Sequence, residues 1–213
     1  MKIIYKNGTD EIVEKKSRFI ANVFKVESEE QAVDIINNMK KKFWDARHNC
    51  YAYIIGDNNE VQKFSDDGEP SGTAGKPIMD IILSEKIHNC LIVVTRYFGG
   101  TLLGTGGLIR AYQEASKKGI AQSEVIDAIE GVSAYIDTDY NNMGKIQYIC
   151  AEQNVLIEDI EYTDKVHIKL LIPKEYYMQF VHIITDRFSG NVEVIENGEQ
   201  KYSKMASGEV ILL

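Results

Sequence analysis

Two glycine-rich segments of this chain gather the residue types that could bind or transform a ligand. The first covers residues 65–77 and combines three carboxylates, a lysine and three glycines before a predicted helix start at Pro77. Its charged residues are Asp66, Asp67, Glu69 and Lys76. Carboxylates at this spacing can act as acid, base or metal ligands, and backbone amides near Gly75 can bind an anion at the helix start. A turn whose acids only complement the helix N-terminus is the competing interpretation.

The second segment covers residues 95–110, where glycines crowd the end of an apolar strand and the start of a helix. They are Gly99, Gly100, Gly104, Gly106 and Gly107. Amides there can point outward at the positive end of the helix dipole. Arg96 and Arg110 bracket the segment and suit phosphate or carboxylate binding, while Tyr97 and Phe98 could stack a base. Alternatively, the glycines permit a close helix-to-sheet crossing, with both arginines solvated and Phe98 in the core.

Several established motifs are absent from the sequence. A nucleotide-binding P-loop needs Ser or Thr after its lysine, and here Pro77 follows Lys76. The dinucleotide pattern G-x-G-x-x-G fails because Ile109 stands where the third glycine belongs. Neither a G-x-S-x-G elbow nor an H-E-x-x-H helix occurs. We therefore assign no catalytic residue and favour a protein that is not an enzyme.

A repeated tripeptide raises the question of a metal site. His48-Asn49-Cys50 recurs as His88-Asn89-Cys90, and two such pairs on strands could present two His and two Cys to zinc. The usual Cys-x₂-Cys spacing is missing, so we expect Cys50 and Cys90 to be small buried residues. A Cys-His nucleophile pair has no evident orienting partner. No metal or cofactor is predicted.

Hydrophobic periodicity places these segments on helices and strands. Residues 11–26 predict a strand, and the capping-box spacing from Ser28 predicts a helix to about residue 43. Strands follow at 50–55 and 61–64, then a helix from Pro77 to about Lys86. The continuous apolar run 91–95 predicts a central strand buried on both faces. The next helix carries Leu108, Ala111, Tyr112 and Ala115 inward and should stop at Gly119.

A few residues around the first helix can be interpreted from the same periodicity. Lys40, Lys41 and Lys42 end it, where cations complement the dipole, although they could border an RNA-binding face. The helical register favours core positions for Phe43 and Trp44.

The remaining residues predict a second unit with the order βαββαβ. Its strands are expected at 132–140, 155–162, 166–172 and 191–202, and its helices at 142–154 and 175–188. This order is that of the ferredoxin-like split βαβ sandwich, which serves many unrelated functions. Residues 123–130 are expected to form a linker, so we predict domains at 1–127 and 128–213.

Charge divides along the same boundary. The 213 residues carry a formal net charge of -8, but residues 1–125 hold 17 basic and 17 acidic residues, whereas residues 126–213 hold 7 and 15. Phosphate backbones repel an acidic tail, so nucleic-acid binding is expected only in the neutral first part. Three dispersed cysteines and the lack of a signal peptide or membrane span favour a cytoplasmic protein without membrane contacts.

Across both glycine segments the sequence resembles the IMPACT family, in its bacterial two-domain, YigZ-type branch. Three blocks carry the resemblance, namely ARHNCYAY at 46–53, residues 65–77, and the segment from Val93 through Tyr112. The likeness covers about residues 17–120, and the tail looks like the family's small bacterial C-terminal domain. His88 and Cys90 lie outside the family blocks, which weakens the zinc interpretation further.

The resemblance implies an α+β protein with an N-terminal domain like domain 2 of ribosomal protein S5 and a ferredoxin-like C-terminal domain. Eukaryotic relatives regulate a starvation-response kinase acting on translation initiation, through a helper protein on the ribosome. They carry an additional N-terminal partner-binding domain that is not expected in this chain, so that partner is not carried over. The implied function is a non-enzymatic, translation-associated regulator that binds RNA or a ribosomal component. The alternatives are a small-molecule enzyme acting on a phosphorylated or carboxylated substrate with Asp66, Asp67 or Glu69 as acid or base, and a purely protein-binding regulator.

The family supplies no established catalytic residues, so the binding residues follow from our interpretation of its motif positions. We expect an anion- or nucleic-acid-binding set comprising Arg47, His48, Lys76, Arg96, Tyr97, Gly99, Gly100, Gly104, Gly106, Gly107 and Arg110. The natural ligand, the oligomeric state and the role of the acidic tail stay open at this point.

Overall fold

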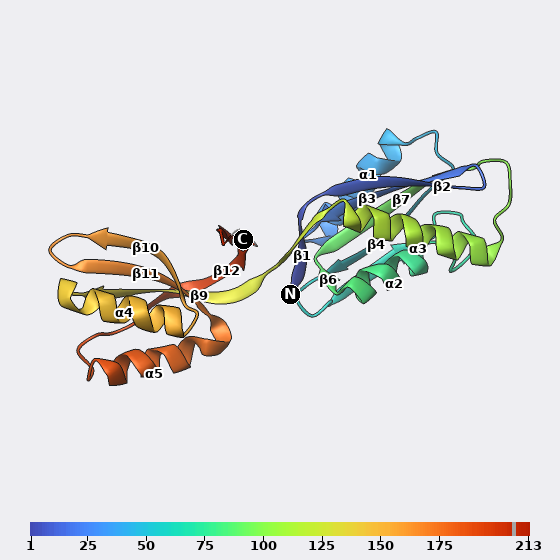
Figure 1. The fold of residues 1–213 in the computed structure, drawn as a ribbon. Coiled ribbons are helices and arrows are strands. Elements are labelled where there is room, and N and C mark those ends of the chain that lie inside the picture. The colour runs from blue at the N-terminus through green and yellow to red at the C-terminus, as the bar shows by residue number, and fades with distance from the viewer. Residues whose placement is uncertain (206–207) are drawn as a thin grey trace. The chain divides into compact units, whose positions relative to one another are not determined.

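The computed structural model describes residues 1–205 and 208–213, which form two compact units, Met1–Asp127 and Ala128–Leu213. Each unit has its own hydrophobic core, and both mix helices with mainly antiparallel strands (Figure 1). The predicted two-domain α+β class is therefore confirmed.

The first unit is built on a five-stranded antiparallel sheet with the order β2-β3-β7-β4-β5. The strands are β2 (Gly8–Glu14), β3 (Ser17–Lys25), β4 (His48–Ile55), β5 (Val61–Ser65) and β7 (Cys90–Tyr97). The apolar run at 91–95 lies in β7, the middle strand, where every residue from Cys90 to Arg96 is buried. A strand covered on both faces needs apolar side chains in both alternating sets, and this explains the unbroken run.

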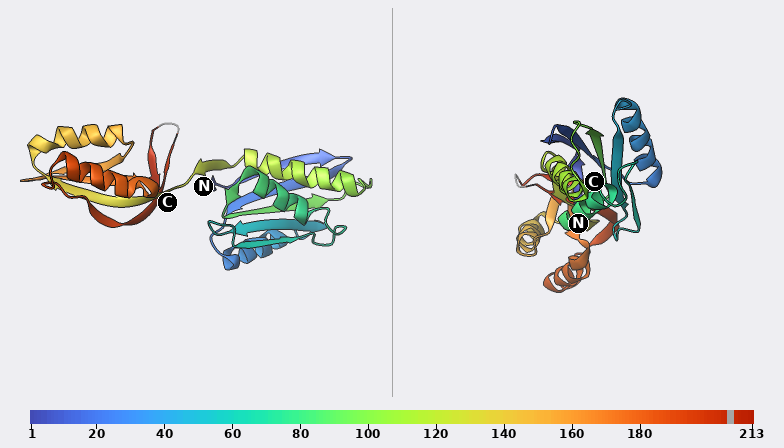
Figure 2. Two further views of the ribbon diagram at one scale, coloured as in Figure 1. Left: turned by 90° about the horizontal axis from the view of Figure 1, so that it is seen from below. Right: turned by 90° about the vertical axis from the view of Figure 1, so that its right-hand side faces the viewer.

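Helices cover both faces of this sheet (Figure 2). Helix α1 (Glu29–Lys42) packs with Leu91 and Val93 on one face, and α2 (Gly75–Glu85) and α3 (Thr105–Ala121) pack with Ile92 and Val94 on the other. The predicted cap of α1 is confirmed, since the Ser28 hydroxyl accepts from the Gln31 amide at 3.2 Å. Strand alternation then fixes which side chains at the strand ends belong to the α2 and α3 face.

Two sequence-based expectations about the helices and strands of the first unit are wrong. Residues 11–26 form a hairpin rather than one strand, because Lys15 and Lys16 turn the chain with φ values of 45° and 69°. Helix α3 continues through Gly119, which lets the helix approach β3: an added Cβ would lie 3.0 Å from the side chains of Ala21 and Val23. This glycine therefore serves close packing and does not stop the helix.

The expected linker at 123–130 is also ordered as strand. Strand β8 (Glu124–Asp127) pairs antiparallel with β1 (Lys2–Lys6), which pairs in parallel with the short β6 (Ile87–His88). Neither β1 nor β6 is among the sequence-predicted strands. Their pairing is non-local, so periodicity within a short segment could not reveal it.

The second unit has the predicted βαββαβ order, followed by an additional short strand. Its elements are β9 (Ile129–Thr138), α4 (Tyr140–Glu152), β10 (Leu156–Tyr162), β11 (Val166–Pro173), a 3₁₀ turn (Lys174–Tyr176), α5 (Tyr177–Arg187), β12 (Ile195–Lys204) and β13 (Val210–Leu212). The antiparallel sheet order is β10-β11-β9-β12-β13. The first four strands of that order give the ferredoxin-like arrangement expected from the sequence.

Among residues 1–205 and 208–213, no helix is both long and apolar enough to cross a bilayer.

Candidate functional site

The candidate site lies at one end of the first unit's sheet, on the face covered by α2 and α3. Alternation along β7 puts Arg96 on the same face as Ile92 and Val94, and alternation along β4 puts His48 there with Cys50. His48 and Arg96 are directly paired in the register of the two strands. Two polar side chains therefore meet where the apolar core ends.

Arg96 is held in a buried ion pair. Its Nη1 lies 2.6 Å from Oε1 of Glu69, and the two side chains are 7% and 3% exposed. Tyr112 on α3 donates its hydroxyl to the same oxygen at 2.8 Å. The Nε of Arg96 is buried and has no hydrogen-bond partner among the residues that the structure describes. Arg96 is therefore neither exposed to solvent nor unpaired. It holds Glu69 against the sheet.

His48 is oriented by the backbone of the first glycine segment. Its Nδ1 lies 2.8 Å from the carbonyl oxygen of Asp67. A carbonyl can only accept a hydrogen bond, so Nδ1 carries the proton and the neutral ring leaves Nε2 as an acceptor. Nε2 lies 3.9 Å from Oε1 of Glu69, beyond hydrogen-bond distance. The ring thus presents an acceptor beside the Glu69–Arg96 pair.

The other two carboxylates of the first segment bind groups of the protein itself. Asp66 accepts from the amides of Gly72, Ala74 and Gly75 at 2.8, 3.0 and 2.8 Å, and so caps the start of α2. Asp67 accepts from Lys40 Nζ at 2.6 Å and from the Asn49 amide at 2.7 Å. The helix start near Gly75 is thus occupied by an internal carboxylate. Lys76 pairs with Asp80 one turn along the same helix.

The start of α3 is built differently from the start of α2. Its N-cap is Gly104, with φ at 72° and no side chain to accept a hydrogen bond from the first turn. The first intrahelical bond runs from the Leu108 amide to the Gly104 carbonyl. A helix leaves its first amides without intrahelical partners, so those of Thr105, Gly106 and Gly107 are available to an anion.

The two glycines that begin the second segment have distinct roles. An added Cβ at Gly99 would lie 2.0 Å from the backbone of Lys16, and the Gly99 amide donates to the Ser17 hydroxyl at 3.1 Å. Gly99 therefore lets the segment cross the β2-β3 hairpin. Gly100 has a φ of 82° and open space around its Cα, so it serves the turn itself.

These groups surround a cavity of about 350 Å³, hereafter the loop cavity. Its lining joins all three motif blocks: Arg47, His48, Gly68, Glu69, Pro70, Arg96, Phe98, Leu102, Leu103, Gly104, Thr105 and Leu108. The charged side chains in this lining, two arginines and one glutamate, sum to +1 with His48 neutral. Phe98 and Leu102 are 40% and 82% exposed. The loop cavity therefore combines a positive end with an apolar rim.

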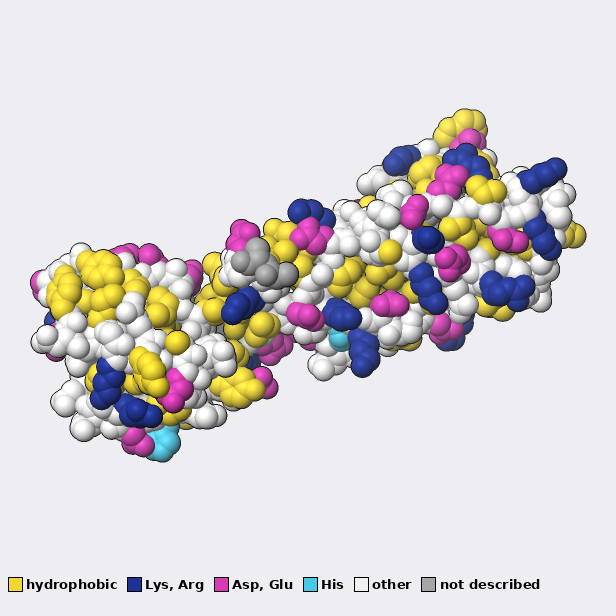
Figure 3. All heavy atoms as spheres, viewed as in Figure 1, with side chains coloured by type: hydrophobic (Ala, Val, Ile, Leu, Met, Phe, Trp, Pro, Cys, Tyr) yellow, Lys and Arg dark blue, Asp and Glu magenta, His cyan; other side chains and the backbone are white. Residues whose placement is uncertain are grey.

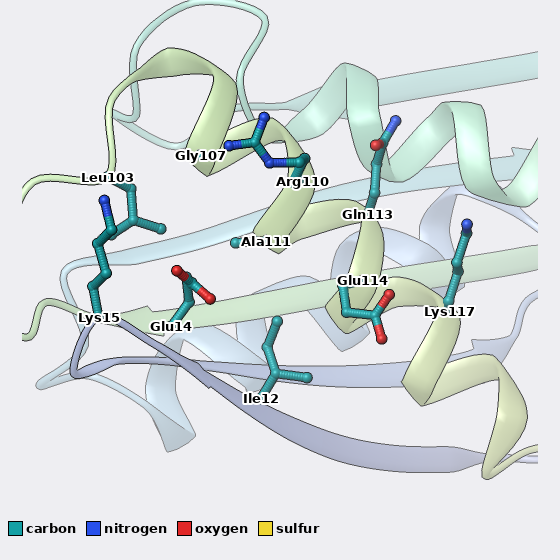
Figure 4. Close-up of a pocket in the computed structure, with 10 residues that line it drawn as sticks. All are labelled: Ile12, Glu14, Lys15, Leu103, Gly107, Arg110, Ala111, Gln113, Glu114 and Lys117. Atoms are coloured by element: carbon teal, nitrogen blue, oxygen red, sulfur yellow. The ribbon is translucent and has the colours of Figure 1, made fainter.

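Arg110 and Tyr97 lie outside the loop cavity. Arg110 lines a neighbouring groove of about 470 Å³ between α3 and the β2-β3 hairpin, with Lys15 and Lys117, and Figure 4 shows its side chain reaching back toward Gly107. Leu103 lines both the groove and the loop cavity, so the two adjoin. Tyr97 donates its hydroxyl to Asp45 at 2.8 Å. Phe98 is exposed rather than in the core.

The structure supports neither the zinc interpretation nor the core position predicted for Trp44. Cys50 pairs with Val94 and Cys90 with Ile54, so the two thiols lie four residues apart along the paired strands. Among the described residues, no group of three or more His, Cys, Asp or Glu is placed to hold a metal. Burial raises the pKa of both thiols well above the ordinary range. Trp44 is 82% exposed because it follows the end of α1, where the helical register no longer holds.

Tyr112 and Ser17 were absent from the expected site residues. Tyr112 was assigned to the core as one of the apolar stripe of α3, and its ring does pack against Phe19 with centroids 5.1 Å apart. Its hydroxyl nevertheless reaches Glu69 from inside the core. A buried Tyr usually finds a partner for its hydroxyl, and this was the available signal.

Two family models match the chain. The Impact N-terminal domain matches residues 15–120, and a domain of unknown function, DUF1949, matches residues 136–191. The chain is 37% identical over 203 residues to an IMPACT family member, YvyE, of Bacillus subtilis, with 95% of this chain and 93% of that protein covered. It is 30% identical to the IMPACT family member YigZ of Escherichia coli, covering 85% and 90%.

Solved structures are similar to the chain as well. A crystal structure of a hypothetical protein superposes with a TM-score of 0.59 at 28% identity, covering 91% of this chain and 95% of that one. The structure of a two-domain translational regulator, Yih1, covers 56% and 48% with 24% identity and a TM-score of 0.38. A likeness at the latter score supports no conclusion about the present chain.

Proposed function

Because this chain belongs to the IMPACT family, we propose that it is a non-enzymatic regulator of translation that binds RNA, or an RNA-bearing component of the translation machinery, through its first unit. The contact is centred on the loop cavity and continues into the adjoining groove that contains Arg110. The observation that carries the proposal is the uncapped start of α3, which opens onto a cavity of net charge +1 in a protein of net charge -8.

The distribution of charge supports a local contact rather than a broad one. Residues 1–127 carry 17 basic and 18 acidic residues, whereas residues 128–213 carry 7 and 14. Figure 3 shows basic and acidic side chains interspersed over the visible face of the first unit. Such a surface does not attract a phosphate backbone over its whole area, so affinity must come from a few well-placed groups.

The residues of the site divide into binding and positioning roles. The helix amide of Thr105 suits a phosphate oxygen, and the exposed Arg47 at the rim can bind a phosphate bidentately. Glu69 and Arg96 hold the floor of the cavity in shape through their ion pair. In the groove, Lys15 and Arg110 can meet the phosphates of neighbouring nucleotides.

The test is RNA binding by the full chain as a function of salt. Fluorescence anisotropy with a labelled single-stranded RNA should give affinity that falls with added KCl, with a slope of about -0.7 per phosphate contact. Arg47→Ala and Arg110→Ala should each weaken binding and reduce that slope by roughly one contact. Lys118→Ala removes one charge at the far end of α3, about 20 Å along the helix from Thr105, and should leave the slope unchanged.

Three outcomes would contradict the proposal. The first is absence of salt-dependent binding, and the second is equal loss in Arg47→Ala and Lys118→Ala. In the third, crosslinking in cells recovers a protein partner without RNA, which would favour a purely protein-binding regulator.

A small-molecule enzyme is the second candidate, and one observation favours it. His48 and Glu69 line the loop cavity together, as an acid-base pair would, whereas Asp66 and Asp67 are engaged by the protein itself. A screen of phosphorylated and carboxylated metabolites by thermal shift separates the two functions. A true substrate at about 100 times its dissociation constant stabilises the fold by roughly 2.7 kcal/mol, and its conversion would be detected by mass spectrometry.

A further inference from the structure

We infer that the loop cavity holds one unpaired nucleotide, with its phosphate at the start of α3 and its base against Phe98. This inference rests on the proposed function and names the form of RNA that the site takes. Single-stranded RNA is bound with one nucleotide inserted, and duplex RNA is excluded because its bases are already paired and stacked.

The size of the loop cavity sets the first limit. Its volume of about 350 Å³ lies at the lower end of the roughly 300–1,000 Å³ typical of small-molecule sites. A cavity of this size accepts one nucleotide and not a folded element. Its lining combines the backbone at the start of α3, at Gly104 and Thr105, with the apolar side chains of Phe98 and Leu102, and a ligand with an anionic end and an apolar end can use both.

The anionic end of the ligand fits the start of α3. At α2, the Asp66 carboxylate accepts from the amides of Ala74, the N-cap residue, and Gly75, the first helical residue, so that helix start binds a carboxylate. At α3, Gly104 offers no side chain, and the site is left to a ligand.

A second, independent feature of the cavity wall also favours an anionic ligand. The Arg96 side chain is 7% exposed and lines the cavity, and although Glu69 binds its Nη1, its Nε has no partner among the described residues. Arg47, exposed at the rim, adds a further positive charge that a phosphate can reach.

The base fits the rim formed by Phe98 and Leu102. Phe98 is an aromatic ring 40% exposed at the mouth of a cavity, and Leu102 beside it is 82% exposed. The guanidinium carbons of Arg47 and Arg96 lie 5.8 and 5.6 Å from the Phe98 ring centroid. Aromatic rings and guanidinium planes are the groups on which proteins stack unpaired bases, with little dependence on sequence.

The experiment measures binding of three probes, namely AMP, adenosine and inorganic phosphate, to the full chain by calorimetry. AMP should bind more tightly than adenosine or phosphate, because it alone fills both ends of the cavity. Single-stranded RNA should bind more tightly than a duplex of the same sequence, and AMP should compete with it. Equal binding of adenosine and AMP, or no preference for single strands, would overturn the inference.

Two variants separate the two ends of the site. Phe98→Ala should weaken AMP and single-stranded RNA roughly tenfold without affecting phosphate, while Val13→Ala, another exposed apolar residue, should change nothing. Thr105→Glu places a carboxylate in the first turn of α3, where it complements the dipole and repels a phosphate, so AMP binding should be lost with the fold intact. Asn37→Asp adds the same charge on α1, on the opposite face of the sheet, and should have no effect.

The outcomes distinguish this inference from the proposed function. If RNA binding depends on Arg47 but not on Phe98 or Thr105, the nucleotide site is wrong and the proposed function stands. If AMP binds and RNA does not, RNA binding is wrong and the cavity serves a free nucleotide.

Discussion

Arg96 and Glu69 form an ion pair that ties the second glycine-rich segment to the first. The Nη1 of Arg96 lies 2.6 Å from Oε1 of Glu69, and both side chains are almost fully buried. The residues come from the end of the central strand β7 and from the loop before α2. The shape of the loop cavity therefore depends on a contact between segments that are distant in the sequence.

Removal of one partner of this pair should be costly. Arg96→Met leaves the Glu69 carboxylate buried without its cation, and we expect a loss of about 3–5 kcal/mol in the free energy of unfolding. Urea denaturation of the full chain measures this loss in the free energy of unfolding. Arg18→Met removes an exposed arginine that pairs with Glu11, and should change the free energy of unfolding much less than Arg96→Met does. Equal losses in the two variants would contradict a buried pair.

The hydroxyl of Tyr112 should contribute to the same network. Tyr112→Phe keeps the ring packed on Phe19 and removes the hydrogen bond to Glu69, so stability should fall by about 1–3 kcal/mol. Tyr148→Phe changes a hydroxyl on an exposed ring and serves as the matched control. Chemical denaturation of both variants measures this loss. An unchanged midpoint for Tyr112→Phe would mean that Glu69 does not need the hydrogen bond from the Tyr112 hydroxyl.

Asp66 should act as a helix cap and not as a catalytic acid. Asp66→Ala removes the acceptor of the Gly72, Ala74 and Gly75 amides and should destabilise the chain by about 1–2 kcal/mol. Asp34→Ala, at an exposed position on α1, should change stability by no more than about 0.5 kcal/mol. Thermal unfolding measured by circular dichroism compares them. Loss of RNA binding without loss of stability in Asp66→Ala would assign Asp66 to the ligand instead.

Alanine substitution should have opposite effects on the stability of the fold at two glycines of the second segment. Gly99→Ala would place its Cβ 2.0 Å from the Lys16 backbone, so the hairpin must shift and stability must fall. Gly106→Ala lies in the first turn of α3, where the nearest atom is 3.5 Å away, and should stabilise by about 0.5–1 kcal/mol. Denaturation midpoints test the contrast, and a stabilised Gly99→Ala would refute the close crossing.

The buried cysteines should make the chain less stable at high pH. Burial raises the pKa of the Cys150 thiol to about 11. An unfolded thiol ionises near pH 8.5, so the unfolded state loses its proton first as the pH rises. The stabilisation is complete below about pH 8.5 and is lost between there and pH 11. Unfolding curves at pH 7.5 and 10 should show the decrease, and Cys150→Ala should reduce it.

Thiol alkylation provides an independent check on the same residues. Cys50, Cys90 and Cys150 are all buried, so iodoacetamide at pH 8 should modify them only after urea is added. Mass spectrometry of the intact chain counts the modified cysteines. Rapid modification of Cys50 in the folded protein would reopen the interpretation of that residue as a nucleophile beside His48.

Local patterns were sufficient for most of the fold. The apolar run of β7, the Ser28 cap and the βαββαβ order of the second unit were predicted from periodicity and are confirmed. Periodicity works there because each element buries one stripe or face, and burial is encoded within a few consecutive residues. The same logic failed for Gly119 and Trp44, whose environments depend on a neighbouring strand and on where α1 ends.

Patterns along the chain indicate which residues share a strand face and which segments contain the glycines, arginines and carboxylates of the site. The pairing of Glu69 with Arg96, the capping of α2 by Asp66 and the place of Arg110 in a neighbouring groove are evident only in three dimensions. Glycines stand at both helix starts, so composition alone does not distinguish the start that Asp66 caps from the one that has no side-chain cap. The difference depends on where a loop folds back in space, and hydrogen bonds between distant segments are set by strand register and loop closure, which short-range patterns do not encode.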